Sequence, residues 1–358
     1  MNSSLGMLAA MLPGQADAAL IISGENRRYF TGFVSSAGYL LVTRNNAYLF
    51  VDFRYAEAAK SIATGCEVIS FSDFGKEFAA VLQKENVKSL LYEGSAFTLS
   101  QAARIDEILT KCGAEGIRSD DADRCISKLR IIKTAHETEK IITAQRITEQ
   151  ALKDTLKLVR EGVAERDLAL ELEYRMRKLG ADGISFDLIV IAGQKTSMPH
   201  GVPGENRIRP GDFITFDIGA LYRGYHSDMT RTYAYGYVND KQKRIYSVVK
   251  QAQQLALDAV KAGVRCCDVD KAAREYIYHA GFEGCFGHST GHGVGLEIHE
   301  QPFVSSKNEK ALESGMVITV EPGVYLPGEF GVRIEDMVTV TSEGCINLAT
   351  LSKELTIL

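Results

Sequence analysis

The stretch GDFITFD, residues 211–217, is repeated in altered form as GMVITVE, residues 315–321. Both copies place a glycine first, an Ile-Thr pair in the middle and an acid last, and both continue through a second glycine to a tyrosine. A further acid follows each copy, Asp228 after the first and Glu335 after the second. A repeat of this kind is typical of a duplicated structural unit. We therefore predict a domain of two related halves with pseudo-twofold symmetry, and two such halves can face one site.

The repeat also predicts how four acids lie. An antiparallel hairpin that turns at residues 222–224 would set Asp217 directly opposite Asp228. The same construction in the second copy would set Glu321 opposite Glu335. The neighbouring residues are mostly apolar, so both pairs should be buried, where like charges directly across a ladder destabilise the sheet. Some other group must therefore neutralise these carboxylates.

Divalent cations would supply that neutralisation. Carboxylate oxygens combined with one or two imidazoles suit Mn, Co, Fe or Zn, and a pair of such ions needs several carboxylates, some of them bridging. The alternative is that the acids are exposed strand-end residues, or that they form ion pairs with the nearby arginines Arg223, Arg231 and Arg333.

The stretch GHSTGHGVGLEIHE, residues 287–300, holds three of the seven histidines between closely spaced glycines. It can supply the nitrogen ligand for such a metal centre. Its first five residues also fit the G-x-S-x-G pattern of serine hydrolases, but the residues before them make a weak strand and the glycines after them break the helix that the pattern needs. His288 and His292 have i, i+4 spacing without the glutamate of an H-E-x-x-H motif, which excludes a thermolysin-like zinc helix.

Length and composition narrow the class of protein. A chain of 358 residues favours two domains or one large α/β unit, and a net charge of −5 lacks the basic excess that nucleic-acid binding needs. The amino terminus has neither an early basic residue nor a long apolar run, so no signal peptide or membrane span is expected. Seven scattered cysteines without a C-x-x-C pair suit reduced thiols in the cytoplasm.

The chain divides into two predicted domains, 1–125 and 126–358. The first has alternating apolar runs and helical patterns, with a hairpin expected around Asn45 between two strands, and it contains no catalytic constellation. A capping-box signature, Thr134 followed by Glu137, begins a long amphipathic helix near the start of the second domain. Further helical patterns cover about 135–160, 165–180, 240–262 and 267–280. The fold class is therefore α/β or α+β.

Four stretches of the second domain resemble, in order and spacing, the metallopeptidases of the pita-bread fold. They are FDIGALYRGYHSDMTRT (216–232), TGHGVGLEIHE (290–300), TVEPGVYL (319–326) and GVRIEDMV (331–338). This family includes methionine aminopeptidase, aminopeptidase P and prolidase. In the first domain, NRRYFTGF (26–33) and VDFRYAEA (51–58) resemble the smaller domain of creatinase and of the Xaa-Pro branch, which methionine aminopeptidases lack.

The resemblance implies an exopeptidase that uses two divalent metal ions, Mn first among them with Co, Zn or Fe as alternatives. Its substrate would be a peptide with proline in second position, as for an Xaa-Pro aminopeptidase or dipeptidase, and the family leads us to expect a homodimer. The metal ligands carried over by position are Asp217, Asp228, His292, Glu321 and Glu335, with Asp228 and Glu335 bridging.

The same resemblance assigns substrate-side roles. His299 would polarise the scissile carbonyl, and Glu321 would shuttle a proton toward the leaving nitrogen. His200 matches a second histidine over the active-site mouth, and His288 matches one found in the proline-directed branch. Arg333, two residues before Glu335, would share its face and hold its carboxylate.

Three alternatives stay open at this point. A metal-free hydrolase like creatinase would lack some of the five ligands. A non-catalytic binding protein on the same fold would show broken ligand positions and long charged extensions. A methionine aminopeptidase-like enzyme of other N-terminal specificity would share the ligands but not the first domain.

Overall fold

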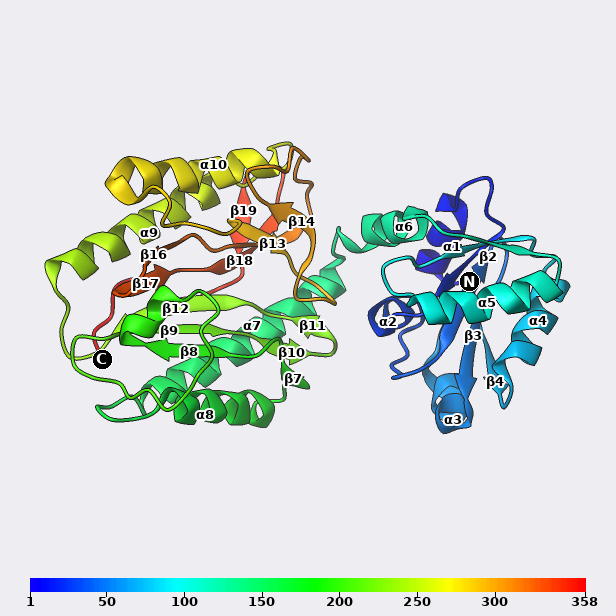
Figure 1. The fold of residues 1–358 in the computed structure, drawn as a ribbon, viewed down its shortest axis with the longest axis horizontal. Helices are drawn as coiled ribbons and strands as arrows, with labels where there is room; N and C mark the ends of the chain where they lie inside the picture. Colours follow the sequence, from blue (N-terminus) through cyan, green and yellow to red (C-terminus); the bar gives the residue numbers. More distant parts are fainter. The chain divides into compact units, whose positions relative to one another are not determined.

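The computed structural model describes residues 1–358, and the chain forms two compact units, Met1–Arg130 and Ile131–Leu358 (Figure 1). Each unit has its own buried apolar core. The architecture is mixed α/β, as the alternating patterns predict.

The first unit is a six-stranded mixed sheet with helices on both faces. Its elements are α1 (Ser3–Met11), β1 (Ala18–Ile21), α2 (Gly24–Thr31), β2 (Tyr39–Thr43), β3 (Ala47–Asp52), α3 (Phe53–Ile62), β4 (Glu67–Phe71), α4 (Phe74–Lys84), β5 (Ser89–Tyr92), α5 (Leu99–Lys111), β6 (Glu115–Ile117) and α6 (Asp121–Arg130). The strand order is β4-β3-β2-β1-β5-β6. The predicted hairpin is confirmed, because β2 and β3 pair antiparallel across the Asn45 turn. Side chains alternate between the faces, so Leu40 packs toward α1 while Leu41 packs toward α4 and α5.

The second unit repeats one construction twice. The first half comprises α7 (Ala135–Leu156), α8 (Glu165–Lys178), β7 (Gly183–Ile184), β8 (Ile189–Ala192), the 3-10 turn η1 (Gly193–Ser197), β9 (Phe213–Ile218), β10 (Ala220–Tyr222), β11 (Tyr225–His226) and β12 (Met229–Ala234). The second half comprises α9 (Asp240–Ala259), α10 (Cys266–Ile277), the π-helical turn η2 (Tyr278–Phe282), β13 (Gly291–Gly293), β14 (Glu300–Val304), β15 (Val317–Val320), β16 (Gly323–Leu326), β17 (Phe330–Arg333), β18 (Asp336–Val340) and β19 (Cys345–Asn347).

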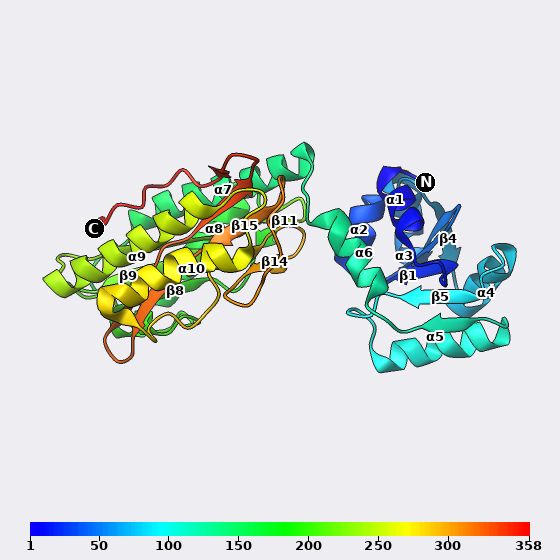
Figure 2. The same ribbon diagram turned by 90° about the horizontal axis from the view of Figure 1, so that it is seen from above.

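The two halves match in their sheets and in their helices. In the first half β9 lies between β8 and β12, and in the second half β15 lies between β13 and β18, with every pairing antiparallel. A pair of consecutive helices covers each sheet, α7 with α8 and α9 with α10, as Figures 1 and 2 show. The two copies of the sequence repeat therefore form the equivalent central strands β9 and β15.

The register of the first hairpin differs from the prediction. Asp217 pairs with Thr230, so Asp228 is displaced by two residues from the position opposite Asp217. The cause is the turn, which consists of Arg223 and Gly224 alone, both with positive φ, as a two-residue hairpin turn requires. A two-residue shift leaves both acids on the same face of the sheet, whereas a one-residue shift would separate them.

The second hairpin keeps the predicted register. Val320 pairs with Asp336 on one side and Gly323 with Arg333 on the other. Glu321 and Glu335 lie between these two pairs, where the strands leave one ladder and enter the next. The predicted helices are also present, and Thr134 and Glu137 form the predicted reciprocal capping box at the start of α7.

Candidate metal centre

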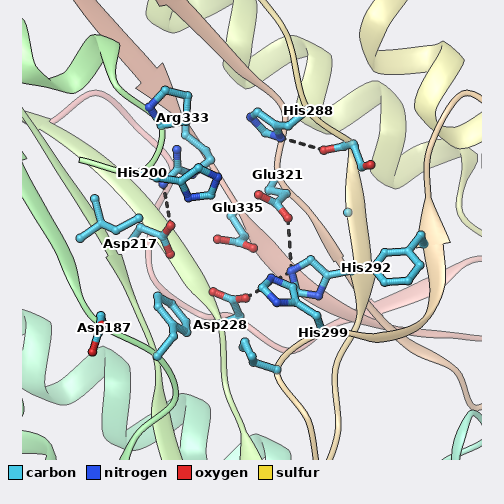
Figure 3. A pocket seen from close by; sticks show the side chains of 17 residues that line it. Asp187, His200, Asp217, Asp228, His288, His292, His299, Glu321, Arg333 and Glu335 are labelled. Atoms are coloured by element: carbon cyan, nitrogen blue, oxygen red, sulfur yellow. Dashed lines mark hydrogen bonds and ion pairs between the residues drawn. The ribbon is translucent and has the colours of Figure 1, made fainter. Parts of the chain in front are cut away.

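A cavity of about 430 Å³ opens in the second unit, and both halves contribute to its wall. Asp217 comes from the end of β9, His292 from β13, and Glu321 directly follows β15. The cavity is lined by Phe186, Asp187, Ile189, Pro199, His200, Asp217, Asp228, His288, Ser289, Gly291, His292, Ile298, His299, Phe303, Glu321, Arg333 and Glu335 (Figure 3). All eight residues that the sequence pointed to as ligands or catalytic groups therefore line one cavity.

Three of these side chains form a compact set of possible metal ligands. Donor atoms of Asp228, His292 and Glu335 all lie within 4.8 Å of one another, and all three residues are buried. The Nδ1 atom of His292 is 3.1 Å from the carbonyl oxygen of Gly293, while its Nε2 atom is 3.5 Å from Asp228 Oδ2. Two carboxylates and an imidazole nitrogen are a donor set that suits a divalent transition metal.

Glu321 extends this set. Its Oε1 atom lies 3.4 Å from His292 Nε2, and it accepts a hydrogen bond of 3.2 Å from Thr319 Oγ1. The Thr319 hydroxyl in turn accepts a hydrogen bond from the His292 backbone N–H. Thr319 thus connects two of the predicted ligands and holds them on the same side of the cavity.

Asp217 stands apart from the cluster because it has a cationic partner. Its Oδ2 atom is 2.6 Å from Arg333 Nη2. The same guanidinium donates to the Tyr325 hydroxyl and to Thr230 Oγ1. The prediction that Arg333 holds the carboxylate of Glu335 is therefore wrong. Between the two residues the chain passes from β17 into β18, so simple strand alternation does not apply there.

Thr230 takes the place that was expected for Arg333. Its hydroxyl donates a hydrogen bond of 2.7 Å to Glu335 Oε2, and its carbonyl oxygen accepts the Glu335 backbone N–H. The alternative of arginine-paired acids applies only to Asp217, since Arg231 pairs with Asp336 instead. The remaining carboxylates need another cation.

The pKa shifts of the clustered side chains also indicate a site for a cation. Burial, reinforced by repulsion between the carboxylates, raises the pKa values of Asp228 and Glu335 well above the ordinary range. Burial likewise raises the pKa of Glu321 to about 8, and it lowers the pKa of His292 to about 4. Acids placed where they repel one another and a neutral imidazole beside them are the arrangement that a bound cation stabilises. The residues present therefore fit a divalent metal ion.

The other three histidines lie around this cluster. His299 is exposed to the cavity, and its ring packs edge-on against that of His292 with 4.3 Å between centroids. His288 is half-buried, and its Nε2 atom is 2.9 Å from the Tyr325 hydroxyl. His200 is exposed on the loop that follows η1. In Figure 3, the side chains of His200 and His299 lie on opposite sides of the acids.

An ion pair on α10 holds the histidine-rich stretch in place. Asp270 is fully buried and makes two hydrogen bonds with the guanidinium of Arg274, one turn later on the helix. Arg274 also donates to the carbonyl oxygens of Phe286 and His288, while Asp270 accepts from the backbone N–H and hydroxyl of Thr290. The segment before His292 is thus bonded to α10 at several points. A lone Asp and Arg on a helix carry no sequence pattern, and sequence reasoning missed this pair.

A second buried acid, Glu165, holds the loop of His200. Its carboxylate accepts hydrogen bonds from Lys195 Nζ at 2.7 Å, from the Gly204 backbone N–H at 3.0 Å and from the Ala192 backbone N–H at 2.8 Å. Both ends of the loop are therefore tied to the start of α8. Sequence reasoning also missed this residue.

The serine-hydrolase alternative fails on geometry. The stretch around Ser289 leads into strand β13, whereas the nucleophile elbow requires a strand before the serine and a helix after it. The Nδ1 atom of His288 contacts the backbone carbonyl oxygen of Ser289 and not its hydroxyl, and a carbonyl oxygen cannot serve as the nucleophile. The apolar lining residues Phe186, Ile189, Ile298 and Phe303 were also not predicted, because single apolar residues outside a motif carry no signal.

Comparison with known proteins places the chain in a family. Residues 139–342 match the model of metallopeptidase family M24, and residues 7–132 match that of the creatinase/prolidase N-terminal domain. An Xaa-Pro dipeptidase of Pyrococcus horikoshii is 38% identical over 95% of this chain and 94% of its own length. Among solved structures, an Xaa-Pro dipeptidase from Bacillus anthracis has a TM-score of 0.94 at 39% identity, covering 99% of both chains. An X-Pro aminopeptidase from Thermotoga maritima has a TM-score of 0.89 at 36% identity, covering 96% of this chain and 98% of that one.

The chain belongs to metallopeptidase family M24. It is a metallopeptidase with the pita-bread catalytic fold and a creatinase-like first domain, it acts on peptides, and its family depends on divalent metal ions. The match in the first unit argues against a methionine aminopeptidase-like enzyme, which would lack that domain. None of the helices combines the length and apolar character that crossing a lipid bilayer requires.

Proposed function

We propose that the protein is an exopeptidase that hydrolyses the peptide bond between an N-terminal residue and proline. The observation that carries the proposal is the buried cluster of Asp228, His292 and Glu335, with Glu321 beside it, in a cavity open to solvent. The names of the relatives, Xaa-Pro dipeptidase and X-Pro aminopeptidase, support the specificity for proline.

Two divalent ions, which we propose to be Mn with Co, Zn or Fe as alternatives, would be held by Asp217, Asp228, His292, Glu321 and Glu335. Asp228 and Glu335 belong, with His292, to the set whose donor atoms lie within 4.8 Å of one another, and the family resemblance assigns the bridging role to these two carboxylates. When bound, such ions polarise a peptide carbonyl and lower the pKa of a water molecule toward neutrality. Arg333 keeps Asp217 oriented toward the cavity through the 2.6 Å ion pair.

The chain's own residues perform the proton transfers and stabilise developing charge. His299 donates an N–H hydrogen bond to the oxygen of the scissile carbonyl as that oxygen becomes negative. Partial burial lowers the pKa of His299, so its imidazole is neutral at pH 7 and donates without first gaining a proton. Glu321, whose carboxylate lies beside the cluster at 3.4 Å from His292 Nε2, takes a proton from the attacking water and passes it to the proline nitrogen. His200 and His288 contact the substrate from the rim of the cavity.

We further propose that catalysis takes place in residues 126–358 and that residues 1–125 form the creatinase-like domain. We also propose that the protein is a homodimer. A cytoplasmic location is proposed from the seven cysteines, none of which forms a disulfide.

Turnover on matched peptides tests the proposed function. After removal of metal with a chelator, the protein should release the first residue from Ala-Pro peptides only when Mn or Co is restored. Peptides with alanine in place of the proline should be cleaved far more slowly, as followed by mass spectrometry. Full turnover in the presence of excess chelator, or equal rates on both peptides, would contradict the proposal.

The pKa shifts predict an unusual dependence of stability on pH in the metal-free protein. The raised pKa values of Asp228, Glu321 and Glu335 mean that the folded state keeps protons that the unfolded state has already lost at pH 7. Their stabilising effect is complete below pH 4 and is lost as the pH rises through the folded-state values. For each proton retained, the free energy of unfolding falls by about 1.4 kcal/mol per pH unit.

The window between pH 7 and 9 isolates this effect, because His292, with a pKa of about 4, is neutral there whether the chain is folded or not. The melting temperature of the chelated protein should fall between pH 7 and 9. Added Mn should remove most of that fall, since a metal binds the deprotonated acids. A chelated protein whose melting temperature is flat over this range would show that folding does not raise the pKa values of these acids.

A further inference from the structure

The wall of the cavity is rich in acids and poor in free cations. Five of the lining residues are carboxylates, namely Asp187, Asp217, Asp228, Glu321 and Glu335. Arg333 is the one lysine or arginine among them, and its guanidinium is already bonded to Asp217, Tyr325 and Thr230. Arg333 pairs with Asp217 and leaves the other carboxylates unpaired, and the positive charge of two divalent ions would do no more than neutralise those. No cationic side chain of the wall is thus available to a further anion.

The lack of a free cationic side chain in the cavity wall affects which length of substrate can bind. In an Xaa-Pro dipeptide the proline carries a free carboxylate one residue from the scissile bond, and holding a carboxylate in a partly buried site requires a cation or a charge-assisted hydrogen bond. In a longer peptide the same position is a neutral amide. The imidazoles of the wall can donate an N–H hydrogen bond to a carboxylate or to an amide carbonyl, but as neutral donors they do not supply the positive charge that would balance a carboxylate placed beside five acids.

The rim offers apolar contacts to a chain that continues. Phe303 on β14 lines the cavity while remaining 42% exposed, and Met198 and Val202, which flank the lining residues Pro199 and His200 in the sequence, are 57% and 75% exposed. Large apolar side chains exposed in or beside a cavity are typical of a binding surface. They provide contact for residues of a peptide that follow the proline.

We propose that the enzyme acts on Xaa-Pro-Yaa and longer peptides in preference to Xaa-Pro dipeptides, because the cavity wall has acids and apolar groups but no free cation to accept a dipeptide's carboxylate. The inference rests on the proposed function and specifies its substrate class.

Three substrates with the same first residue test it: Ala-Pro, Ala-Pro-amide and Ala-Pro-Ala, under identical metal loading. The amide and the tripeptide should each show kcat/KM at least tenfold above that of the dipeptide, mainly through a lower KM. A dipeptide cleaved as well as the other two would overturn the inference while leaving the proposed function intact. Failure to cleave any of the three would overturn the proposed function and the inference together.

Binding without turnover gives an independent readout. Isothermal titration should show tighter binding of prolinamide than of free proline, because prolinamide has a neutral amide in place of the carboxylate of proline. Equal or tighter binding of proline would contradict the inference.

A substitution at the rim supplies the missing charge. Phe303→Lys should raise kcat/KM for Ala-Pro relative to Ala-Pro-amide about tenfold, whereas Phe303→Met, of similar length and without charge, should leave the ratio of the two substrates unchanged. An equal ratio in the lysine and methionine variants would mean that charge at the rim does not set substrate length.

Discussion

Replacing Glu335 by glutamine is expected to remove bound metal and to lower kcat/KM by about 10³-fold or more, since a metal-assisted reaction loses several kcal/mol of transition-state stabilisation. Glutamine has nearly the same shape, so packing is preserved, and its amide oxygen can still accept the hydrogen bond from Thr230. The change therefore tests the charge of this side chain rather than its volume. Metal content by mass spectrometry and initial rates on Ala-Pro-Ala measure the two effects.

Glu335→Gln has a second expected consequence that separates it from simple misfolding. Because the substitution removes one of several mutually repelling acids, the chelated variant should melt at or above the temperature of the chelated wild type. Glu329→Gln is the matched control, since Glu329 lies exposed on the same hairpin and pairs with Lys241. It should bind metal and turn over like the wild type. A Glu335→Gln variant with normal metal content would refute the ligand assignment.

His299→Ala is expected to lower kcat about 10²-fold, the usual effect of removing one donor to a developing oxyanion. Metal content should not change, because the three-ligand cluster does not include His299. His299→Gln should recover part of the loss, since its amide can donate a hydrogen bond from a similar position. His279→Ala is the control, as this histidine is exposed on η2 and outside the cavity.

A merely structural role for His299 predicts a different pattern. Its ring packs against His292, so loss of that contact alone would lower metal affinity and stability together, and glutamine would not restore kcat. A drop in metal content that accounts for the whole loss of activity would contradict a catalytic role.

The internal repeat is what made the fold readable from the sequence. Gly211 and Gly315 each lie two residues before equivalent strands, and the repeat predicted both the paired halves and the acids at their strand ends. The register of the second hairpin followed from the sequence, but that of the first did not. Arg223 has a positive φ, which non-glycine residues seldom adopt, so nothing in the sequence distinguished a two-residue turn from a longer one.

The candidate site was readable where residues belong to a motif and unreadable where they meet through tertiary packing. His292 and Glu321 stand in dense motifs, whereas Asp270 and Glu165 hold the site from helices whose sequences look ordinary. The partner of Arg333 could not be inferred because its guanidinium reaches across to Asp217 on the other half of the repeat. Such contacts depend on how the two halves pack together, and strand periodicity holds no information on that packing.

The central claim is that side chains from both halves of the repeat surround a pair of divalent ions. Anomalous diffraction at the manganese absorption edge, from crystals grown with Mn, tests it most directly. We expect two peaks in the cavity, both within coordination distance of Asp228 and Glu335, with His292 bound to one of them. A cavity without a peak, or a metal bound only elsewhere on the chain, would contradict the claim.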